Sequence, residues 1–185
     1  MEDSGLIAAT LDGDRQAFLV LVGRYAPLAV AAAYSFARDI EVAEEVAASG
    51  LVLAYGRLGA EGERCNMPAL VVKSVRLAHR SWGMNKQAGK KLKAVSWMKA
   101  LDESKSSTAR RERFMNSTRR VRDAVNRLPV PQRLAVNLRF MAGMSYRDVA
   151  RALRTKPEAV SALLVKGSAT LRKKLIDLEP RERTS

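Results

Sequence analysis

The residues from Pro129 to Leu175 offer chemistry for binding a polyanion rather than for catalysis. Ser145 and Asp148 have the S-x-x-D spacing of a capping box, in which two side chains satisfy the free N–H groups that open a helix. Thr155 to Glu158 form a second box only ten residues later, with a proline in its first turn. Gly143 can close the preceding helix in a left-handed conformation. Two helix starts so close together are typical of a helix-turn-helix, whose second helix enters the major groove of DNA.

This motif carries two kinds of candidate DNA contact. Residues on the outward face of the second helix would meet base edges: Lys156, Ser161, Ala162, Val165 and Lys166. Basic residues around them would meet phosphates: Arg139, Arg147, Arg151, Arg154, Arg172 and Lys173. The alternative is an ordinary three-helix bundle with a solvated basic face. The two boxes and the local charge favour DNA binding.

Charge is distributed unevenly along the chain. The formal net charge is +14 over 185 residues, yet residues 1–66 hold five basic and ten acidic side chains, a net of −5. Residues 67–116 carry +9 and residues 117–176 carry +11. A strongly basic chain indicates a polyanionic partner. An acidic front and a basic back predict two surfaces for two different partners.

Several classes of function are disfavoured. A single cysteine, Cys65, and a single histidine, His79, leave no donor set for a metal site, so no metal and no cofactor are expected. No glycine loop suited to phosphate and no nucleophile with a base is visible, so we expect the protein not to be an enzyme. The N-terminus has no secretory signal, and the apolar runs look too short and interrupted to span a bilayer. We therefore expect a soluble, cytoplasmic protein without membrane insertion.

The elements that must position these residues are all helices, because helical spacing recurs and two-residue alternation does not. We expect a short helix at 6–11, a helix at 14–38 that Pro27 kinks or divides, and a third that Asp39 caps. The glycines at 56, 59 and 62 predict a loop, and a fourth helix should run over 67–82 with Asn66 as its cap. The predicted fold is all-α, with two small helical domains.

The expected domain organisation follows from composition. Residues 1–82 form a four-helix domain, 83–116 a basic flexible linker with some helix in its middle, 117–178 the helix-turn-helix domain, and 179–185 a tail. Trp82 and Trp97 flank the start of the linker, and each could either pack in a core or stack on unpaired bases.

The N-terminal domain has candidate surfaces of both signs. Its acidic face consists of Asp39, Glu41, Glu44 and Glu45. Its basic stripe consists of Lys73, Arg76 and Arg80, which the three- and four-residue spacing places on one side of a helix.

The N-terminal and C-terminal domains expected from the sequence both resemble parts of one protein family. The C-terminal residues that carry the resemblance are Leu128-Pro129, Gln132-Arg133, Leu138-Arg139-Phe140, Gly143, Ser145-Tyr146, Asp148-Val149-Ala150 and Leu171-Arg172. The N-terminal ones are Gly13-Asp14, Ala17-Phe18, Leu21, Arg24-Tyr25, Pro27, Asp39 and Ala43-Glu44-Glu45. They look like regions 4 and 2, respectively, of the extracytoplasmic-function (ECF) sigma factors of the sigma-70 family.

The resemblance implies a division of labour between the domains. Region 2 would dock on the clamp of core RNA polymerase through the acidic face and open the −10 promoter element next to the basic stripe. Region 4 would bind the −35 element and the polymerase flap. An anti-sigma factor is a further partner that the family implies, and catalysis would belong to the polymerase.

The sequence departs from the family pattern in three places. Ala48, Ser49 and Leu51 stand where the family has a Gln-Glu pair and then Phe. Val72, Lys73, Val75 and His79 replace an Ile-Ala-x-Asn and a following Asp, and the run 159–163 lacks the usual Lys and Arg, which removes two charge-assisted contacts. Two hypotheses follow: a sigma factor with an unusual promoter preference, or a sigma-like regulator or adapter. The adapter would bind polymerase or an anti-sigma factor without full promoter-opening activity.

Overall fold

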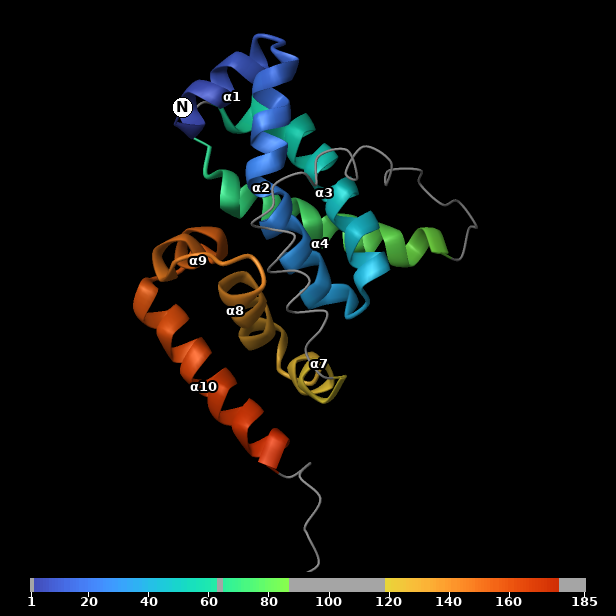
Figure 1. Ribbon diagram of the computed structural model, residues 1–185. Coiled ribbons are helices and arrows are strands. Elements are labelled where there is room, and N and C mark those ends of the chain that lie inside the picture. The colour runs from blue at the N-terminus through green and yellow to red at the C-terminus, as the bar shows by residue number, and fades with distance from the viewer. Residues whose placement is uncertain (1, 63–64, 87–118, 177–185) are drawn as a thin grey trace, which may run out of the picture.

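A computed structural model describes residues 2–62, 65–86 and 119–176. Every regular element within these ranges is an α-helix, so the predicted all-α fold is confirmed (Figure 1). Predictions that concern 87–116, Trp97 and the tail at 179–185 lie outside the described residues.

Helices α1 (Asp3–Leu11) and α2 (Arg15–Ala37) form the first hairpin. The Asp14 carboxylate accepts hydrogen bonds from the backbone N–H groups of Gln16 and Ala17, which starts α2. Asp3 of α1 accepts a hydrogen bond from the Tyr25 hydroxyl and pairs with Arg24, both on α2. Burial and this hydrogen bond raise the pKa of Tyr25.

Helix α2 continues without a break through its proline, so the predicted division at Pro27 is wrong. A proline inside a helix loses one hydrogen bond, but Tyr25 and Leu28 on either side of it are buried. Packing on both sides of the proline holds the helix together. By length and composition α2 could also cross a membrane, contrary to the expectation that no apolar run is long enough. However, 56% of its apolar window is buried inside the protein, as in a core helix, and the criterion is weak evidence.

Helix α3 (Ile40–Glu61) begins at the predicted cap, where the Asp39 carboxylate accepts a hydrogen bond from the N–H of Val42 at 3.1 Å. It passes through Gly56 and Gly59 and ends at a third glycine with a φ of 72°. The predicted loop over these glycines is therefore wrong. A glycine in a helix costs about 1 kcal/mol, and the burial of Ala54 and Leu58 on the inner face of α3 outweighs that cost.

Helix α4 (Met67–Lys86) begins as predicted, because the Asn66 side-chain oxygen accepts a hydrogen bond from the N–H of Ala69 at 3.2 Å. It continues four residues past Trp82, where we expected it to end. Its inner face packs on α2 and α3, with Val71 and Val75 fully buried. We call α1 to α4 the N-terminal half.

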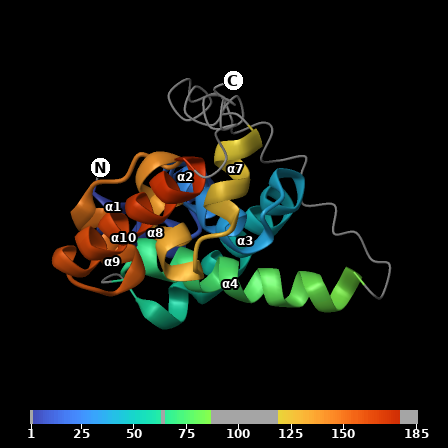
Figure 2. The ribbon, with the colours of Figure 1, turned by 90° about the horizontal axis from the view of Figure 1, so that it is seen from below.

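The C-terminal half consists of α7 (Arg119–Asn126), α8 (Val130–Phe140), α9 (Tyr146–Leu153) and α10 (Pro157–Ile176). α10 packs along α7, α8 and α9 (Figure 2). At Gly167 this packing is close, since an added Cβ would lie 3.3 Å from a methyl group of Val136.

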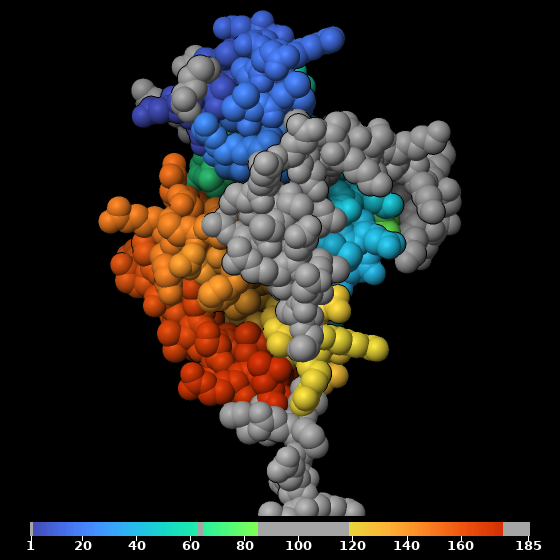
Figure 3. Space-filling view, in the orientation of Figure 1, coloured from blue at the N-terminus to red at the C-terminus, as the bar shows by residue number. Residues whose placement is uncertain are grey.

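The two halves pack against each other. α8 contacts α2, and α9 contacts α4 (Figures 1 and 2). In the space-filling view the orange surface of α9 meets the green start of α4 without a gap (Figure 3). Buried apolar residues of both halves therefore belong to one continuous cluster.

The closest approach of α3 and α4 generates the first prediction. A Cβ added at Gly50 would lie 2.6 Å from the Val75 Cγ2 atom and 2.8 Å from its Cα atom. Because the second of these atoms is backbone, the helices must separate, and Gly50→Ala should destabilise the protein by about 1–3 kcal/mol. Urea unfolding followed by circular dichroism measures this change.

Gly56 on the same helix supplies a matched control. Nothing lies within 4 Å of a Cβ added there. Gly56→Ala should therefore stabilise the protein by about 0.4–1 kcal/mol, through the lower entropy of the unfolded chain. Equal effects of the two substitutions would contradict the close approach.

Candidate nucleic-acid interface

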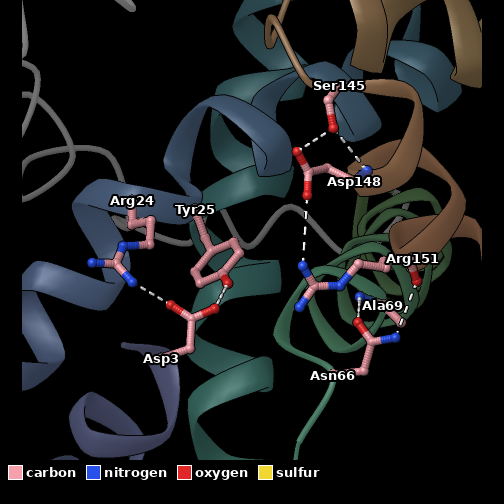
Figure 4. Close-up of polar contacts among 8 residues, drawn as sticks. All are labelled: Asp3, Arg24, Tyr25, Asn66, Ala69, Ser145, Asp148 and Arg151. Atoms are coloured by element: carbon pink, nitrogen blue, oxygen red, sulfur yellow. Dashed lines mark hydrogen bonds and ion pairs between the residues drawn. The ribbon is translucent and has the colours of Figure 1, made fainter. Parts of the chain in front are cut away.

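The predicted cap at Ser145 is present and starts α9, but the box is only half formed, because the Asp148 carboxylate accepts from the Ser145 hydroxyl and not from its backbone N–H. The Ser145 hydroxyl accepts a hydrogen bond from the N–H of Asp148 at 3.2 Å and donates one to the Asp148 carboxylate at 2.6 Å (Figure 4). Gly143 has a φ of 70°, the predicted left-handed conformation. Val149 and Ala150 face the core, so the small residue lies where the two helices of the motif cross.

The turn between α9 and α10 is tighter than the second box implies. Arg154 ends α9 in a left-handed conformation with a φ of 51°. The N–H of Thr155 donates to the carbonyl oxygen of Ala150 at 2.9 Å, which adds Thr155 to the end of α9. α10 then begins at Pro157, so Lys156 and not Thr155 occupies the capping position. The observed helix therefore starts one residue later than predicted.

The residues predicted to meet base edges lie on the outward face of α10 or, for Lys156, directly before its first residue. Lys156, Ser161, Ala162, Val165 and Lys166 are each exposed. Val160 and Leu164 lie on the opposite face and are buried. Val165 is 66% exposed, so this helix presents an apolar side chain among few charges.

Three of the residues predicted to contact phosphates lie along α9 and at its C-terminal cap. Arg147, Arg151 and Arg154 line an open groove together with Asn66, Ala150, Thr155 and Pro157. Arg151 lies 3.6 Å from the Asp148 carboxylate, an exposed pair that contributes little to stability. The groove is bounded on one side by the start of α4, which sequence reasoning did not indicate (Figure 4). Arg172 and Lys173 are exposed at the far end of α10.

Arg139 differs from the other arginines, because it is half-buried and holds local structure. One of its terminal nitrogens donates to the carbonyl oxygen of Met144 at 3.0 Å. Its guanidinium carbon lies 6.0 Å from the ring centre of Phe140 and 5.5 Å from that of Tyr146. Such cation–π contacts contribute about 0.5–1 kcal/mol at exposed sites. Arg139 thus braces the loop before α9.

The N-terminal half has two candidate surfaces: the basic stripe is exposed as predicted, and the acidic face is exposed only in part. Lys73, Arg76 and Arg80 are all exposed along α4. On the acidic face, Asp39 caps α3 and Glu41 is exposed, whereas Glu44 and Glu45 are half-buried.

Glu45 has a structural partner that the sequence did not indicate. Its carboxylate accepts a hydrogen bond from the indole N–H of Trp82 at 3.1 Å. Trp82 is half-buried and packs against the core, which favours the core alternative over base stacking.

Cys65 and His79 take no part in a site. Burial and the Glu61 charge raise the pKa of the Cys65 thiol, so the reactive thiolate is disfavoured. Burial lowers the pKa of His79, whose ring lies 5.9 Å from that of Phe36. Among the described residues, no group of three or more His, Cys, Asp and Glu side chains could hold a metal ion.

Comparison with known proteins agrees with the helix-turn-helix geometry of the C-terminal half. The family model "Sigma-70, region 4" matches residues 118–171, which include α7 to α9 and most of α10. This part of the chain therefore resembles sigma-70 region 4. The predicted resemblance to the sigma-70 family is thereby confirmed for the C-terminal half. A search of the curated proteins finds no match.

A solved structure extends the comparison to both halves. The structure of CnrH in complex with the cytosolic domain of CnrY matches 96% of this chain and 99% of its own, with 21% identity and a TM-score of 0.63. The arrangement of two helical halves is therefore shared with CnrH, and the predicted all-α fold is confirmed for the described residues.

The cap of α9 generates the second prediction. Ser145→Ala removes the acceptor for the N–H of Asp148 and should destabilise the protein by about 0.5–2 kcal/mol. Hydrogen exchange of the α9 amides should rise in the same variant. Ser145→Thr keeps the hydroxyl and is the matched control, so a loss of the same size in both variants would argue against the cap.

Proposed function

We propose that this protein is an ECF-type sigma factor that directs core RNA polymerase to promoters through the −10 and −35 elements and initiates transcription. The observation that carries the proposal is a region 4 helix-turn-helix, with its predicted base-reading residues exposed, packed on a four-helix half in the fold of CnrH. The positive charge of residues 117–176 supports a DNA partner.

Each half has its own task in this proposal. The outward face of α10 reads the −35 element, and Arg147, Arg151 and Arg154 contact its phosphates. The exposed stripe on α4 faces −10 DNA. Glu41, an exposed member of the acidic face, contacts the polymerase clamp, while Glu45 supports the face through Trp82.

The remaining features of the proposal concern partners and chemistry. CnrH was solved with the cytosolic domain of CnrY, and we propose that an anti-sigma factor binds this chain in a comparable way. The protein acts in the cytoplasm without a membrane-inserted segment. It has no catalytic residue or cofactor of its own, because the polymerase supplies the chemistry.

A second candidate is a sigma-like adapter that binds polymerase without opening promoters. The feature that favours it is the low charge of the outward face of α10, where the exposed residues include Ser161, Ala162 and Val165. An apolar side chain can contact thymine methyl groups or a protein partner. Charge-assisted base contacts would be few.

Run-off transcription with purified core polymerase and a promoter library separates the two candidates. Initiation at defined sites supports the sigma factor. Binding to core polymerase without initiation at any promoter supports the adapter. If the chain neither binds core polymerase nor supports initiation, both candidates are wrong.

The third prediction concerns DNA. The logarithm of the binding constant for a DNA duplex should fall linearly with the logarithm of the salt concentration, with a slope of several units. The reason is that contacts to phosphates release counterions. Lys166→Ala should reduce that slope by about 1. Fluorescence anisotropy at salt concentrations of about 50 to 300 mM measures the slope for the wild type and for the variant. Arg127→Ala, an exposed charge between α7 and α8, is the control and should change the slope less. A flat salt response would contradict DNA binding.

The fourth prediction concerns polymerase. Glu41→Lys reverses an exposed charge at the start of α3 and should weaken binding to core polymerase about tenfold, through lost attraction at the docking face. Glu61→Lys makes the same change at the other end of α3, where the side chain is also exposed, and should have little effect. Surface plasmon resonance on immobilised core polymerase compares them, and equal losses would place the docking face elsewhere.

A further inference from the structure

The outward side of α10 forms one band of mostly small side chains. Figure 1 shows α10 at the edge of the molecule, with the helices that it contacts on its inner side. Residues three and four apart along a helix lie on the same side of it. The exposed residues that follow this spacing make up what we call the outward band: Glu158, Ser161, Ala162, Val165, Ser168, Ala169 and Arg172. Between the acid at its start and the arginine at its end, the five residues of the band are uncharged.

Val165 stands in the middle of the outward band. It is 66% exposed, more than any other large apolar residue described in the C-terminal half. A valine is less favourable in a helix than an alanine, because its branched side chain loses freedom there. At this exposure it also adds little to the core. A single exposed apolar residue is ordinary on a protein surface, so the neighbours of Val165 decide what it contacts.

Basic side chains lie at both ends of the outward band. Lys156 directly precedes α10, Lys166 follows Val165 on one flank, and Arg172 and Lys173 stand near the far end, all of them exposed. Such side chains attract the phosphates of DNA. The uncharged part of the band is then left for the base edges, which carry the sequence information. This distribution of charge favours DNA over a protein as the partner of Val165.

The chemistry of the band indicates which base is read. In the major groove, guanine presents two acceptors and is usually bound by a long basic side chain, whereas thymine presents a C5 methyl group and is contacted by apolar side chains. Val165 has no hydrogen-bond donor in its side chain. It has one strongly preferred rotamer in a helix, so a contact that orders it costs little conformational entropy. Ala162 and Ala169, one turn before and after it, are small enough to let the helix approach the bases.

The distance of Val165 from the start of α10 suits this contact. It lies eight residues after Pro157, the first residue of the helix, which is about 12 Å at 1.5 Å per residue. The major groove is about 12 Å wide and about 8.5 Å deep. The N-terminal part of the second helix of a helix-turn-helix lies in this groove, and the first two turns of α10 bring Val165 to its base edges.

We propose that Val165 is a specificity-determining residue that contacts the C5 methyl group of a thymine in the −35 element. Both surfaces in this contact are apolar, and both gain when water leaves them. The inference rests on the proposed function and names a base that its DNA site contains. A recognition helix with arginine or lysine at this position would read guanine instead.

The test uses the full chain assembled with core polymerase. Selection from a random duplex library identifies the bases that are preferred in the −35 element. Each preferred thymine of the selected duplex is then replaced singly by deoxyuridine, which keeps the base pair and lacks only the C5 methyl group. Fluorescence anisotropy compares the binding of each replaced duplex with that of the original. Because the change is made in the DNA, the wild-type measurement does not depend on the folding of any variant.

Replacement of one thymine should weaken wild-type binding about fourfold, the factor expected for one buried methyl-sized group. With Val165→Ala the same replacement should weaken binding less than about twofold, because the shorter side chain does not reach the methyl group. Val130→Ala is the matched control. It makes the same change at a valine that is 43% exposed at the start of α8, and it should keep the fourfold effect. Circular dichroism checks that both variants are folded.

The outcomes distinguish the inference from the proposed function. A selected −35 element whose binding no deoxyuridine changes, or one that deoxyuridine weakens equally for the wild type and Val165→Ala, overturns the inference and leaves the proposed function in place. If deoxyuridine has no effect but Val165→Ala binds core polymerase more weakly, Val165 contacts a protein and the inference is again wrong. If no sequence is selected, the proposed function fails and the inference fails with it.

Discussion

The burial of the Arg133 guanidinium is the constraint on which the arrangement of the molecule depends. Three carbonyl oxygens from two parts of the chain surround it: that of Ser35 in α2, and those of Asn126 and Leu128 at the turn before α8. A buried charge must satisfy its donors or leave the interior. The hydrogen bond from Arg133 to the carbonyl oxygen of Ser35 therefore fixes the position of α8 against α2. The alternative that satisfies the same donors is exposure to water, with the halves apart.

Small side chains let the helices of the N-terminal half pack closely through their inner faces. The outer faces take no part in this packing and can carry opposite charges. Ala29, Ala43 and Ala47 are fully buried, and Gly50 brings α3 into contact with the backbone of α4 at Val75. Helices that pack this closely need few large apolar residues, which agrees with an aromatic content of only 5%. The outer faces are then free to differ, acidic at the start of α3 and basic along α4.

The C-terminal half combines a helix-turn-helix scaffold with an outward face of α10 that carries few charges. Its caps, its left-handed turn at Arg154 and the buried face of α10 are those of a helix-turn-helix, and the region 4 match spans them. The outward face of α10 carries few charges and includes the exposed apolar side chain of Val165. The buried residues that stabilise α10 and the residues proposed to read bases lie on opposite faces of this helix, so the second set can change while the first is maintained.

The sequence by itself determined the features that depend on neighbours three or four residues apart. The caps Asp39, Asn66 and Ser145 and the periodic burial of the helices were readable, because capping and helical spacing are local. The tertiary structure decided the rest. Pro27, Gly56 and Gly59 lie inside helices because packing outweighs their local cost, and Glu45 supports Trp82 from 37 positions away. The partner of Arg133 is 98 residues distant. No local pattern encodes such a contact, since it forms only after both halves have folded and met.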